Sequence, residues 1–298
     1  MINSLSIIIP ALNEEESIKE LIEEINLEFK KVNCNLEIIV VDDFSNKELT
    51  NFISKKENLK IIRNTSRLGQ YGSTLKGADE ASNDFICIID GDGQNPPKEI
   101  IKLLNLYNKN FGDVDVVAGI RRKRKDNLIR KNYSKFANFL IRKLLGSKMI
   151  DLGCSLKIFN KHLLEELRFS GDIHRILLLL FEKRGLRIIQ EEVEHRERIY
   201  GKTNYGFGRI IPVFVDSLIL LITSGMQTTP RYVLGKISTF FLGISLISFC
   251  ISLYQKYFLE TFVHRNPIFL LGITFLFISV QLFITTIITF FIENKNNQ

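Results

Sequence analysis

Hydrophobic residues follow two different patterns along the chain, and the change comes in the last third. In the first part, short β-branched runs alternate with segments whose apolar residues recur every three or four positions. Residues 4–9 and 36–41 are runs typical of buried parallel strands. Between them, residues 17–31 carry apolar side chains at helical spacing. This strand, helix, strand rhythm predicts an α/β fold with a doubly wound sheet.

The same rhythm continues as far as residue 118. It predicts further strands over 59–62, 84–89 and 115–118 and further helices over 73–81 and 97–107. Open α/β sheets bind ligands at the carboxyl ends of their strands, so the loops that follow the strands are expected to meet. The loops expected to build the site are 10–14, 42–45 and 90–95.

The first of these loops contains both a strand-ending signal and a helix-opening signal. Pro10 is expected to end the strand, because proline cannot donate a hydrogen bond to a ladder. Asn13, Glu15 and Glu16 are expected to cap and charge the first turn of the following helix.

Two long uncharged runs in the last third, 237–254 and 267–292, reach the length that crosses a bilayer. Arg231 and Lys236 precede the first run, and most Lys and Arg residues lie before it, which favours a cytoplasmic first domain. We therefore expect a multi-pass protein of the cell (inner) membrane.

Residues 207–225 are apolar but are interrupted by Arg209, Pro212 and Asp216. This pattern favours a helix that lies in the headgroup layer, and a third, poor span is the alternative. The expected division of the chain is a catalytic domain over 1–206, interfacial helices over 207–232 and a two-helix transmembrane domain over 233–298.

The composition excludes several classes of protein. With 45% hydrophobic and 24% charged residues the chain is too apolar to be disordered, and its four cysteines lack CxxC spacing, which argues against a disulfide framework or a zinc site. The basic run 121–125 is either a solvated or membrane-surface face or a specific anion site. It lacks interleaved aromatic residues, so no nucleic-acid partner is expected.

The strongest chemical signal is the segment DGDGQ at 90–94, directly after an apolar strand. Two carboxylates with one residue between them, Asp90 and Asp92, can hold Mg²⁺ or Mn²⁺ together with a diphosphate, because these ions prefer oxygen ligands. A plain Asp/Gly turn is the alternative. A second acidic pair, Asp42 and Asp43, follows another strand and favours the cation site.

Several segments taken together resemble family 2 glycosyltransferases of the polyprenyl-phosphate sugar synthase type, which include dolichol-phosphate mannose synthases and bacterial polyprenyl-phosphate glucosyltransferases. The segments that carry the resemblance, in family order, are 7–18, 38–45, 63–81, 89–97, 119–138, 151–161 and 192–206, followed by two spans. The resemblance covers nearly the whole chain and implies a GT-A fold, a doubly wound nucleotide-sugar-binding domain.

The resemblance also implies a role for each matched position. The positions implied to contact the nucleotide sugar are Pro10, Ala11, Glu14, Val41, Asp43 and Gly91. The implied metal ligands are Asp90, Asp92 and Gln94, with Asp92 also counted as catalytic. The positions implied to bind the phosphates of donor and acceptor are Arg121, Arg130, Ser134 and Arg198.

The chain departs from the family pattern at a few positions. The last lysine of the pattern falls on Asn204, and Lys202 is the neighbouring candidate for its phosphate contact. Phe44 stands where the family usually has glycine, and Gly91 where it often has alanine. Arg130 and Ser134 are four residues apart and would share one face of a helix, as a phosphate site requires.

The implied reaction is metal-dependent, inverting transfer of a hexose from a UDP- or GDP-sugar to an undecaprenyl or dolichyl phosphate. A phosphate monoester is largely ionised at neutral pH, so it is already a nucleophile and needs no general base. A homo-oligomer is left open. One alternative function is that of a catalytically silent membrane scaffold or lipid-binding protein of this fold. Another is that of a processive polysaccharide synthase. Such a synthase needs more membrane spans and a QxxRW motif, whereas this chain has no Trp.

Overall fold

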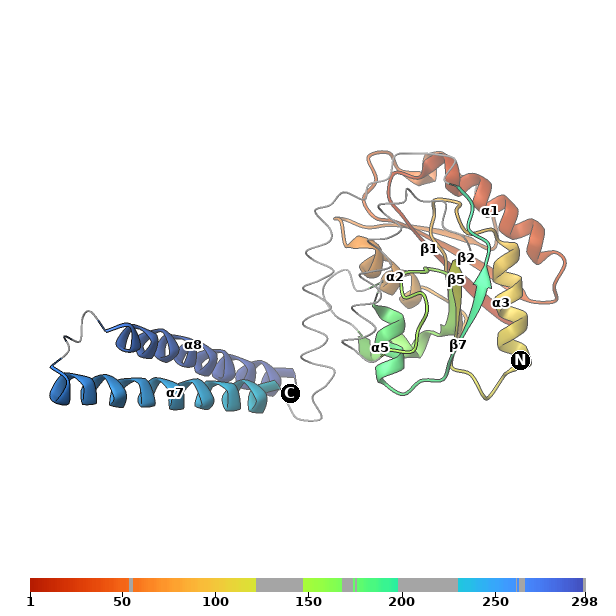
Figure 1. Cartoon of the computed structure of the whole chain (residues 1–298). Coiled ribbons are helices and arrows are strands. Elements are labelled where there is room, and N and C mark those ends of the chain that lie inside the picture. The colour runs from red at the N-terminus through yellow and green to blue at the C-terminus, as the bar shows by residue number, and fades with distance from the viewer. Residues whose placement is uncertain are drawn as a thin grey trace. The chain divides into compact units, whose positions relative to one another are not determined.

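The computed structural model describes residues 1–53, 56–121, 147–167, 174, 176–197, 230–260, 262 and 266–296. The chain divides into two compact units, Met1–Ser217 and Leu218–Gln298, each of which is described by itself (Figure 1). The expected interfacial segment 207–225 lies outside the described residues. The domain boundaries after residues 206 and 232 therefore stay predictions.

The first unit is built on one mixed sheet of seven strands in the order β3-β2-β1-β4-β6-β5-β7. The strands are β1 (Ser4–Ala11), β2 (Asn35–Asp42), β3 (Leu59–Arg63), β4 (Phe85–Ile88), β5 (Val116–Arg121), β6 (Lys157–Asn160) and β7 (Ile188–Val193). β1 pairs in parallel with β2 and β4, and β2 with β3. β6 runs antiparallel between β4 and β5, and β7 pairs in parallel with β5 at the edge.

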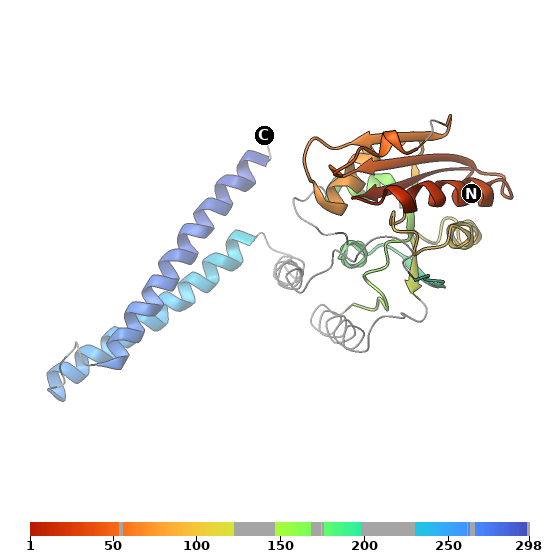
Figure 2. The same cartoon turned by 90° about the horizontal axis from the view of Figure 1, so that it is seen from above.

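Helices cover both faces of this sheet. They are α1 (Glu15–Phe29), α2 (Gly69–Asp79), α3 (Lys98–Lys109) and α5 (Leu177–Lys183), with short 3₁₀ turns η1 (Leu49–Asn51) and η2 (Lys161–Leu167). Figure 2 shows α1 and α3 beside each other, and both bury apolar side chains in one core with Ile7 and Ile9 of β1. Ile8 points to the opposite face, where Gly77 brings α2 close to it. The side-chain alternation of β1 thus separates two apolar layers, as a doubly wound sheet requires.

Pro10 does not end the first strand, so that prediction was wrong. Strand β1 continues through Pro10 to Ala11, paired with β2 throughout. The carbonyl of Ile8 points toward β4, where it accepts the N–H of Ile89. Backbone groups two residues apart in a strand point to the same side, so the nitrogen of Pro10 also points toward β4. Because the β1–β4 ladder ends at Ile8, the missing N–H of Pro10 costs no ladder bond there.

Asn13 does not cap the first helix, so that prediction was also wrong. The residue before α1 is Glu14, and no side chain caps the helix there. Asn13 has a φ of 56°, and its Oδ1 accepts a hydrogen bond from the backbone N–H of Asn46 instead. Glu15 and Glu16 do occupy the first turn of α1 as expected.

The second unit contains two long helices, α7 (Pro230–Phe258) and α8 (Pro267–Asn296). Both are long and apolar enough to cross a membrane, and most of each apolar window faces outward. They pack antiparallel through small residues, with reciprocal hydrogen bonds between Ser238 and Ser279 and one from Ser245 Oγ to Gly272 O. Small residues and hydroxyl-to-carbonyl bonds are typical of helix pairs in membranes.

Candidate active site

The three loops that follow β1, β2 and β4 meet at one edge of the sheet. The backbone N–H of Asn13 donates to Ser45 Oγ at 2.9 Å, which ties the first loop to the second. Ser17 Oγ, on the first turn of α1, donates to the carbonyl of Gly91 at 2.7 Å, which ties the first loop to the third. Parallel pairing of the three strands places these loops at the same edge.

Asp90 and Asp92 lie in the third of these loops, directly after β4. Asp90 Oδ1 accepts a hydrogen bond from Gln70 Nε2 on α2 at 2.5 Å, and the Ser155 hydroxyl also bonds to its carboxyl group. Asp92 is 9% exposed, and its Oδ1 accepts the backbone N–H of Gln94. Burial, followed by repulsion from Asp92, raises the pKa of Asp90.

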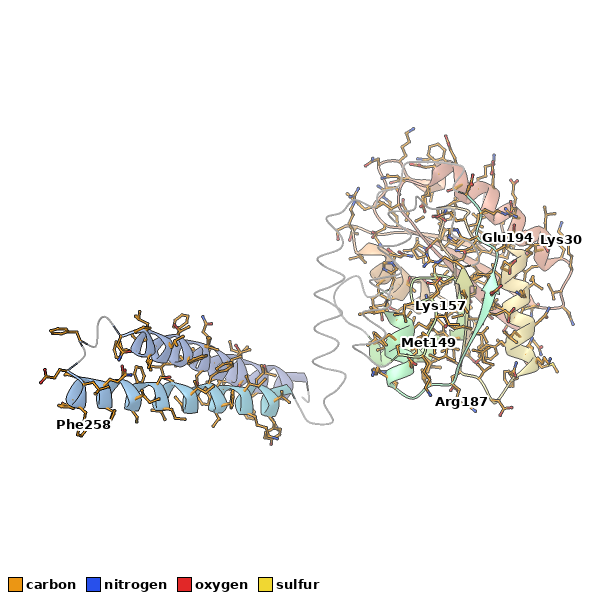
Figure 3. All side chains as sticks on the ribbon, in the orientation of Figure 1. Lys30, Met149, Lys157, Arg187, Glu194 and Phe258 are labelled. Carbon is orange, nitrogen blue, oxygen red and sulfur yellow. The ribbon has the colours of Figure 1, made fainter. Side chains whose placement is uncertain are left out.

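A buried ammonium group lies next to this acidic pair. Lys157, labelled in Figure 3, is 3% exposed. It sits in β6 opposite Ile88, and Ile88 lies two residues before Asp90. Its Nζ donates to the carbonyl of Cys154. Burial lowers the pKa of Lys157, and its positive charge in turn lowers that of Asp90. Strand β6 therefore supplies a cation near Asp90, and Ser155, two residues before this strand, supplies a hydroxyl.

The carboxylate pair fits a divalent cation. Two carboxylates that repel each other in a partly buried corner are stabilised when a cation lies between them. Within the described parts of the chain, no three His, Cys, Asp or Glu side chains are close enough to hold a metal ion. Asp90 and Asp92 would thus supply two oxygen ligands, and a diphosphate and water would complete the shell, as Mg²⁺ sites commonly allow.

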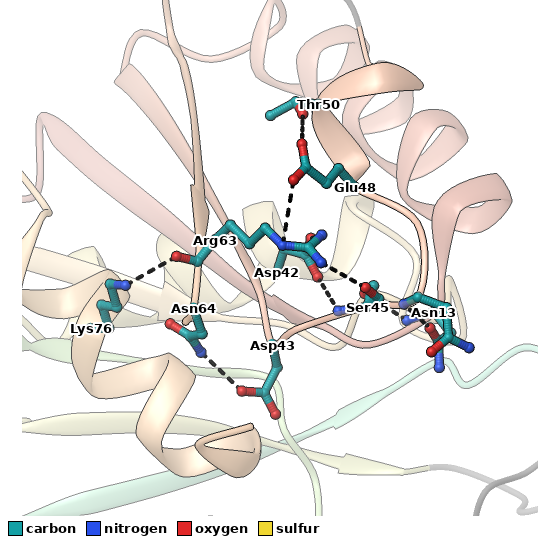
Figure 4. A network of polar contacts seen from close by, with 10 residues as sticks. Asn13, Asp42, Asp43, Ser45, Glu48, Thr50, Arg63, Asn64 and Lys76 are labelled. Carbon is teal, nitrogen blue, oxygen red and sulfur yellow. Dashed lines mark hydrogen bonds and ion pairs between the residues drawn. The ribbon is translucent and has the colours of Figure 1, made fainter. Parts of the chain in front are cut away.

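The second loop forms a network of polar contacts around Asp42 and Asp43 (Figure 4). Asp42 accepts from Arg63 Nη1 and from the backbone N–H of Ser45, both at 2.8 Å. Asp43 Oδ1 accepts from Asn64 Nδ2 at 2.9 Å and from the N–H of Leu68 at 2.7 Å.

Asp43 Oδ2 accepts the backbone N–H of Gly69 at 3.0 Å, at the start of α2. A carboxylate has about four acceptor positions, so one remains for a ligand. Asn64 Oδ1 is buried and has no partner among the described residues, so this corner holds a second unused acceptor.

The remaining positions expected to line the nucleotide pocket lie around these loops. Pro10, Ala11 and Val41 are buried at the ends of β1 and β2, and Val41 packs toward Gly77. Glu14 reaches across to the third loop: a Cβ on Gly91 would lie 2.6 Å from Glu14 Oε2. The bare Gly91 backbone therefore leaves room for the Glu14 carboxylate.

Arg121, at the end of β5, is held by a carboxylate 30 residues further along the chain. Its Nε and Nη2 each donate to Asp151 at 2.8 Å, and its backbone N–H donates to the same side chain. A Cβ on Gly153 would lie 2.8 Å from Arg121 Nη2, so a larger residue there would push the guanidinium out of this position. Burial raises the pKa of Asp151, but hydrogen bonds and the charge of Arg121 lower it to about 2.

The sequence of the first unit matches the model of a known family, described as glycosyl transferase family 2, over residues 6–168, more than half of the chain. The chain belongs to glycosyl transferase family 2. It is a glycosyltransferase, as the resemblance implied.

Two relatives illustrate the similarity within this family. The chain is 32% identical over 232 residues to an undecaprenyl-phosphate 4-deoxy-4-formamido-L-arabinose transferase of Proteus mirabilis. The aligned region covers 76% of this chain and 70% of the relative. It is 30% identical over 295 residues to a dodecaprenyl-phosphate galacturonate synthase of Rhizobium johnstonii. Here the aligned region covers 95% of this chain and 86% of the relative.

Solved structures share the fold at low sequence identity. A mannosyl-3-phosphoglycerate synthase from Rubrobacter xylanophilus superposes with a TM-score of 0.61 at 15% identity and covers 76% of each chain. A glucosyl-3-phosphoglycerate synthase from Mycobacterium tuberculosis, crystallised with Mn²⁺ and UDP-glucose, gives 0.57 at 18% identity and covers 76% of this chain and 81% of its own. The α/β sheet of this chain is thus the GT-A fold that the resemblance implied.

Several residues that the family pattern singles out cannot be placed. Arg130, Ser134, Arg198 and Lys202 lie outside the described residues, so their phosphate contacts stay predictions. Gln94 is described, and its Nε2 donates to the carbonyl of Arg196 at 3.3 Å. Its role as a metal ligand also stays a prediction.

Phe44 shows why the family usually has glycine at its position. Its φ of 62° lies in the left-handed region, which glycine adopts without a Cβ clash. The Phe44 ring is exposed, and the guanidinium of Arg63 lies 5.4 Å from its centre. This cation–π contact offsets part of the backbone strain.

Other residues of the site were not found from the sequence. Gln70, Ser155, Lys157 and Asp151 all contact or surround the predicted carboxylates and Arg121. Lys157 and Asp151 belong to the matched segment 151–161, so that segment was the available signal for them.

Proposed function

We propose that this glycosyltransferase moves a sugar from a nucleotide diphosphate sugar to the phosphate of a polyprenyl lipid. The observation that carries the proposal is the similarity to the dodecaprenyl-phosphate galacturonate synthase, which extends over 95% of this chain and so reaches into both α7 and α8. The arabinose transferase of Proteus mirabilis also has a polyprenyl phosphate in its name. Relatives that differ in sugar thus share the class of acceptor.

The second unit supports a membrane setting for this reaction. A polyprenyl lipid is insoluble in water, and its phosphate lies at headgroup level. Two helices that can cross a bilayer would keep the catalytic unit next to that layer and raise the effective concentration of the acceptor. We propose that the catalytic unit lies on the cytoplasmic face of the cell (inner) membrane, on the basis of the Lys and Arg distribution.

The acceptor needs no general base in this proposal. Its phosphate is a monoester with a second pKa near 6, so it is largely ionised at neutral pH. An oxygen of that phosphate forms the new bond to the anomeric carbon as the bond to the nucleotide diphosphate breaks, with inversion. The enzyme has to hold the two phosphate groups in line and stabilise the leaving charge.

The described residues have distinct parts in this reaction. Asp90 and Asp92 would hold a Mg²⁺ or Mn²⁺ ion, which supplies positive charge to the leaving diphosphate. Arg121 is fixed by Asp151 and would contact a phosphate through the guanidinium edge that Asp151 leaves. Asp43 keeps one acceptor position for the nucleoside.

We propose a UDP- or GDP-sugar as the donor and a hexose as the sugar that is transferred. The names of the relatives add an arabinose derivative and a galacturonate to the sugars that need testing. A homo-oligomer stays a prediction.

The test is transfer of radiolabelled sugar from a panel of UDP- and GDP-sugars to undecaprenyl phosphate by the full chain in detergent. Each reaction is run with Mg²⁺, with Mn²⁺ and with EDTA. Asp92→Ala is compared with Asp113→Ala, an exposed carboxylate on the loop between α3 and β5. We expect metal-dependent glycolipid, at least a hundredfold less with Asp92→Ala and wild-type yield with Asp113→Ala.

The alternative is a catalytically silent membrane protein of the same fold. It predicts no glycolipid with any donor and no metal-dependent nucleotide binding by a folded sample. Nucleotide binding without transfer would instead mean that the donor or acceptor is a different one.

A further inference from the structure

Gln70, in the first turn of α2, joins this helix to the acidic pair of the third loop. Its Nε2 lies 2.5 Å from Asp90 Oδ1. An ionised carboxylate only accepts hydrogen bonds, so the amide presents its nitrogen rather than its oxygen to Asp90. Because the acceptor is charged, this bond is stronger than a hydrogen bond between two neutral groups.

The backbone that carries Gln70 is fixed from outside the helix. The N–H groups of Leu68 and Gly69 donate to the Asp43 carboxylate at 2.7 and 3.0 Å. N–H groups at the start of a helix have no partner within it, and here a side chain from the loop after β2 supplies one. Gly69 has a φ of 77°, which a residue with a Cβ adopts only under strain. The chain therefore enters α2 along one path, and Gln70 follows directly.

A second set of hydrogen bonds holds the same part of α2. Asn64 Nδ2 donates to Asp43 Oδ1 and to Ser73 Oγ, both at 2.9 Å. Thr74 Oγ1 donates to the carbonyl of Gln70 at 2.8 Å. Ser73 and Thr74 are both buried. The Gln70 backbone thus belongs to a rigid corner, and rigid elements position a functional side chain more precisely than loops do.

Asp90 has less support from its own backbone. It lies two residues beyond the end of β4, in a loop, next to Gly91. A carboxylate on a loop can rotate about its side-chain bonds unless a partner fixes it. Groups that fix a ligating side chain commonly change metal affinity by a factor of about 10–100. Asp90 needs such a partner, and α2 provides it.

From the bond to Asp90 and the fixed turn behind it, we infer that Gln70 is a positioning residue of the cation site. It holds the Asp90 carboxylate in the orientation in which Asp90 and Asp92 bind one divalent ion. The nucleoside corner and the cation site then share one element, because Asp43 fixes the turn that carries Gln70. This inference rests on the cation site of the proposed function.

The test measures the Mn²⁺ dissociation constant of the full chain in detergent, from the electron paramagnetic resonance signal of free Mn²⁺. Titrations are run with UDP and, separately, with GDP. Gln70→Met removes the amide and keeps an unbranched side chain of the same length. Thr74→Val is the matched control, because it removes a hydrogen bond of the same helix and leaves the Gln70 amide in place.

We expect Gln70→Met to raise the Mn²⁺ dissociation constant at least tenfold. Gln70→Asn keeps an amide but is one methylene shorter, so it should behave in the same way. Thr74→Val should change the constant less than twofold. A role in packing alone would lower the melting midpoints of the variants and leave the Mn²⁺ affinity of the folded chain unchanged.

A second measurement needs no metal. Melting midpoints in EDTA are compared for Gln70→Met, Asp90→Ala and the double variant. Gln70→Met should lower the wild-type midpoint by roughly 3–6 °C. In the Asp90→Ala background the loss should be less than half as large, because the acceptor of the hydrogen bond is absent. Equal losses in the two backgrounds would overturn the inference.

The failure of this inference can be told apart from the failure of the cation site. An unchanged Mn²⁺ dissociation constant in Gln70→Met overturns the inference alone and leaves the proposed function standing. Absence of Mn²⁺ binding by the wild-type chain with either nucleotide overturns the cation site itself, and this inference with it.

Discussion

Replacing Lys157 with methionine removes a buried ammonium group from beside Asp90 while keeping a side chain of similar length. The two carboxylates then face each other without this positive charge. Lys157 and Asp90 form no direct ion pair among the described residues, but their opposite charges attract each other. With an effective dielectric constant of about 20, we take this attraction as about 2 kcal/mol, and the total cost of Lys157→Met as about 3 kcal/mol.

This cost includes the lost hydrogen bond from Lys157 to the carbonyl of Cys154, about 1 kcal/mol. The rest is charge–charge and depends on Asp90. In an Asp90→Asn background, Lys157→Met should therefore cost only about 1 kcal/mol. Lys161→Met is the matched control, because Lys161 Nζ donates to a carbonyl, that of Ala81, in the same region of the chain.

The assay is thermal unfolding in detergent followed with a thiol-reactive dye. Cys87 and Cys154 are fully buried, and burial raises the pKa of the Cys154 thiol to about 11, so both react only after unfolding. For a unit of this size, 1 kcal/mol shifts the midpoint by roughly 2–4 °C, so Lys157→Met should lower it by roughly 6–12 °C. An equal loss in wild-type and Asp90→Asn backgrounds would refute the electrostatic role of Lys157.

Three further changes test neighbouring parts of the site. Asp151→Asn should lower the free energy of unfolding by about 2 kcal/mol at pH 7, because folding lowers the pKa of Asp151 from 3.8 to about 2. In the wild-type protein this stability is present above pH 4 and is lost as the pH falls toward 2. A pH series of melting midpoints will show the loss. Asp90→Asn should raise the melting midpoint at pH 7, because a carboxyl group whose pKa is raised by folding opposes folding above that pKa. The gain should shrink as the pH falls toward 4. Added Mn²⁺ should raise the midpoint of the wild-type chain only. Gly77→Ala should lower the free energy of unfolding by about 1–3 kcal/mol, and with it the melting midpoint, because the new Cβ would lie 2.6 Å from Ile8 Cγ2. An unchanged midpoint would mean that α2 can move away from the sheet without cost.

The parallel half of the fold could be predicted because its strands are continuous β-branched runs. β1, β2 and β4 were expected within one to two residues of their observed ends, and their order along the chain was enough to bring the three loops together. The site carboxylates Asp43, Asp90 and Asp92 follow directly from those strand ends.

The antiparallel part could not be predicted from periodicity. β6 has only four residues, Lys157–Asn160, and two of them are polar, which is typical of a surface segment rather than a central strand. Lys157 is nonetheless buried, because the strand lies between β4 and β5. Burial lowers the pKa of Lys157 there, and the attraction of Asp90 offsets part of that effect.

Contacts between distant segments were also beyond the sequence pattern. Asp151 lies 30 residues from Arg121, and nothing in the local spacing of either residue indicates a bidentate pair. Gln70 was placed before the predicted helix 73–81, but α2 begins at Gly69, so Gln70 lies in its first turn and reaches Asp90. Backbone N–H groups held by Asp43 explain the earlier start of α2.

The central claim is that the phosphate of a polyprenyl lipid is the nucleophile. The most direct measurement compares undecaprenyl phosphate with undecaprenol as acceptors, under identical conditions and with the donor and metal that give the highest yield. The account predicts a sugar-phospholipid, identified by mass spectrometry, from the phosphate and no product from the alcohol. Equal transfer to undecaprenol, or release of free sugar at the same rate with either lipid, would contradict it.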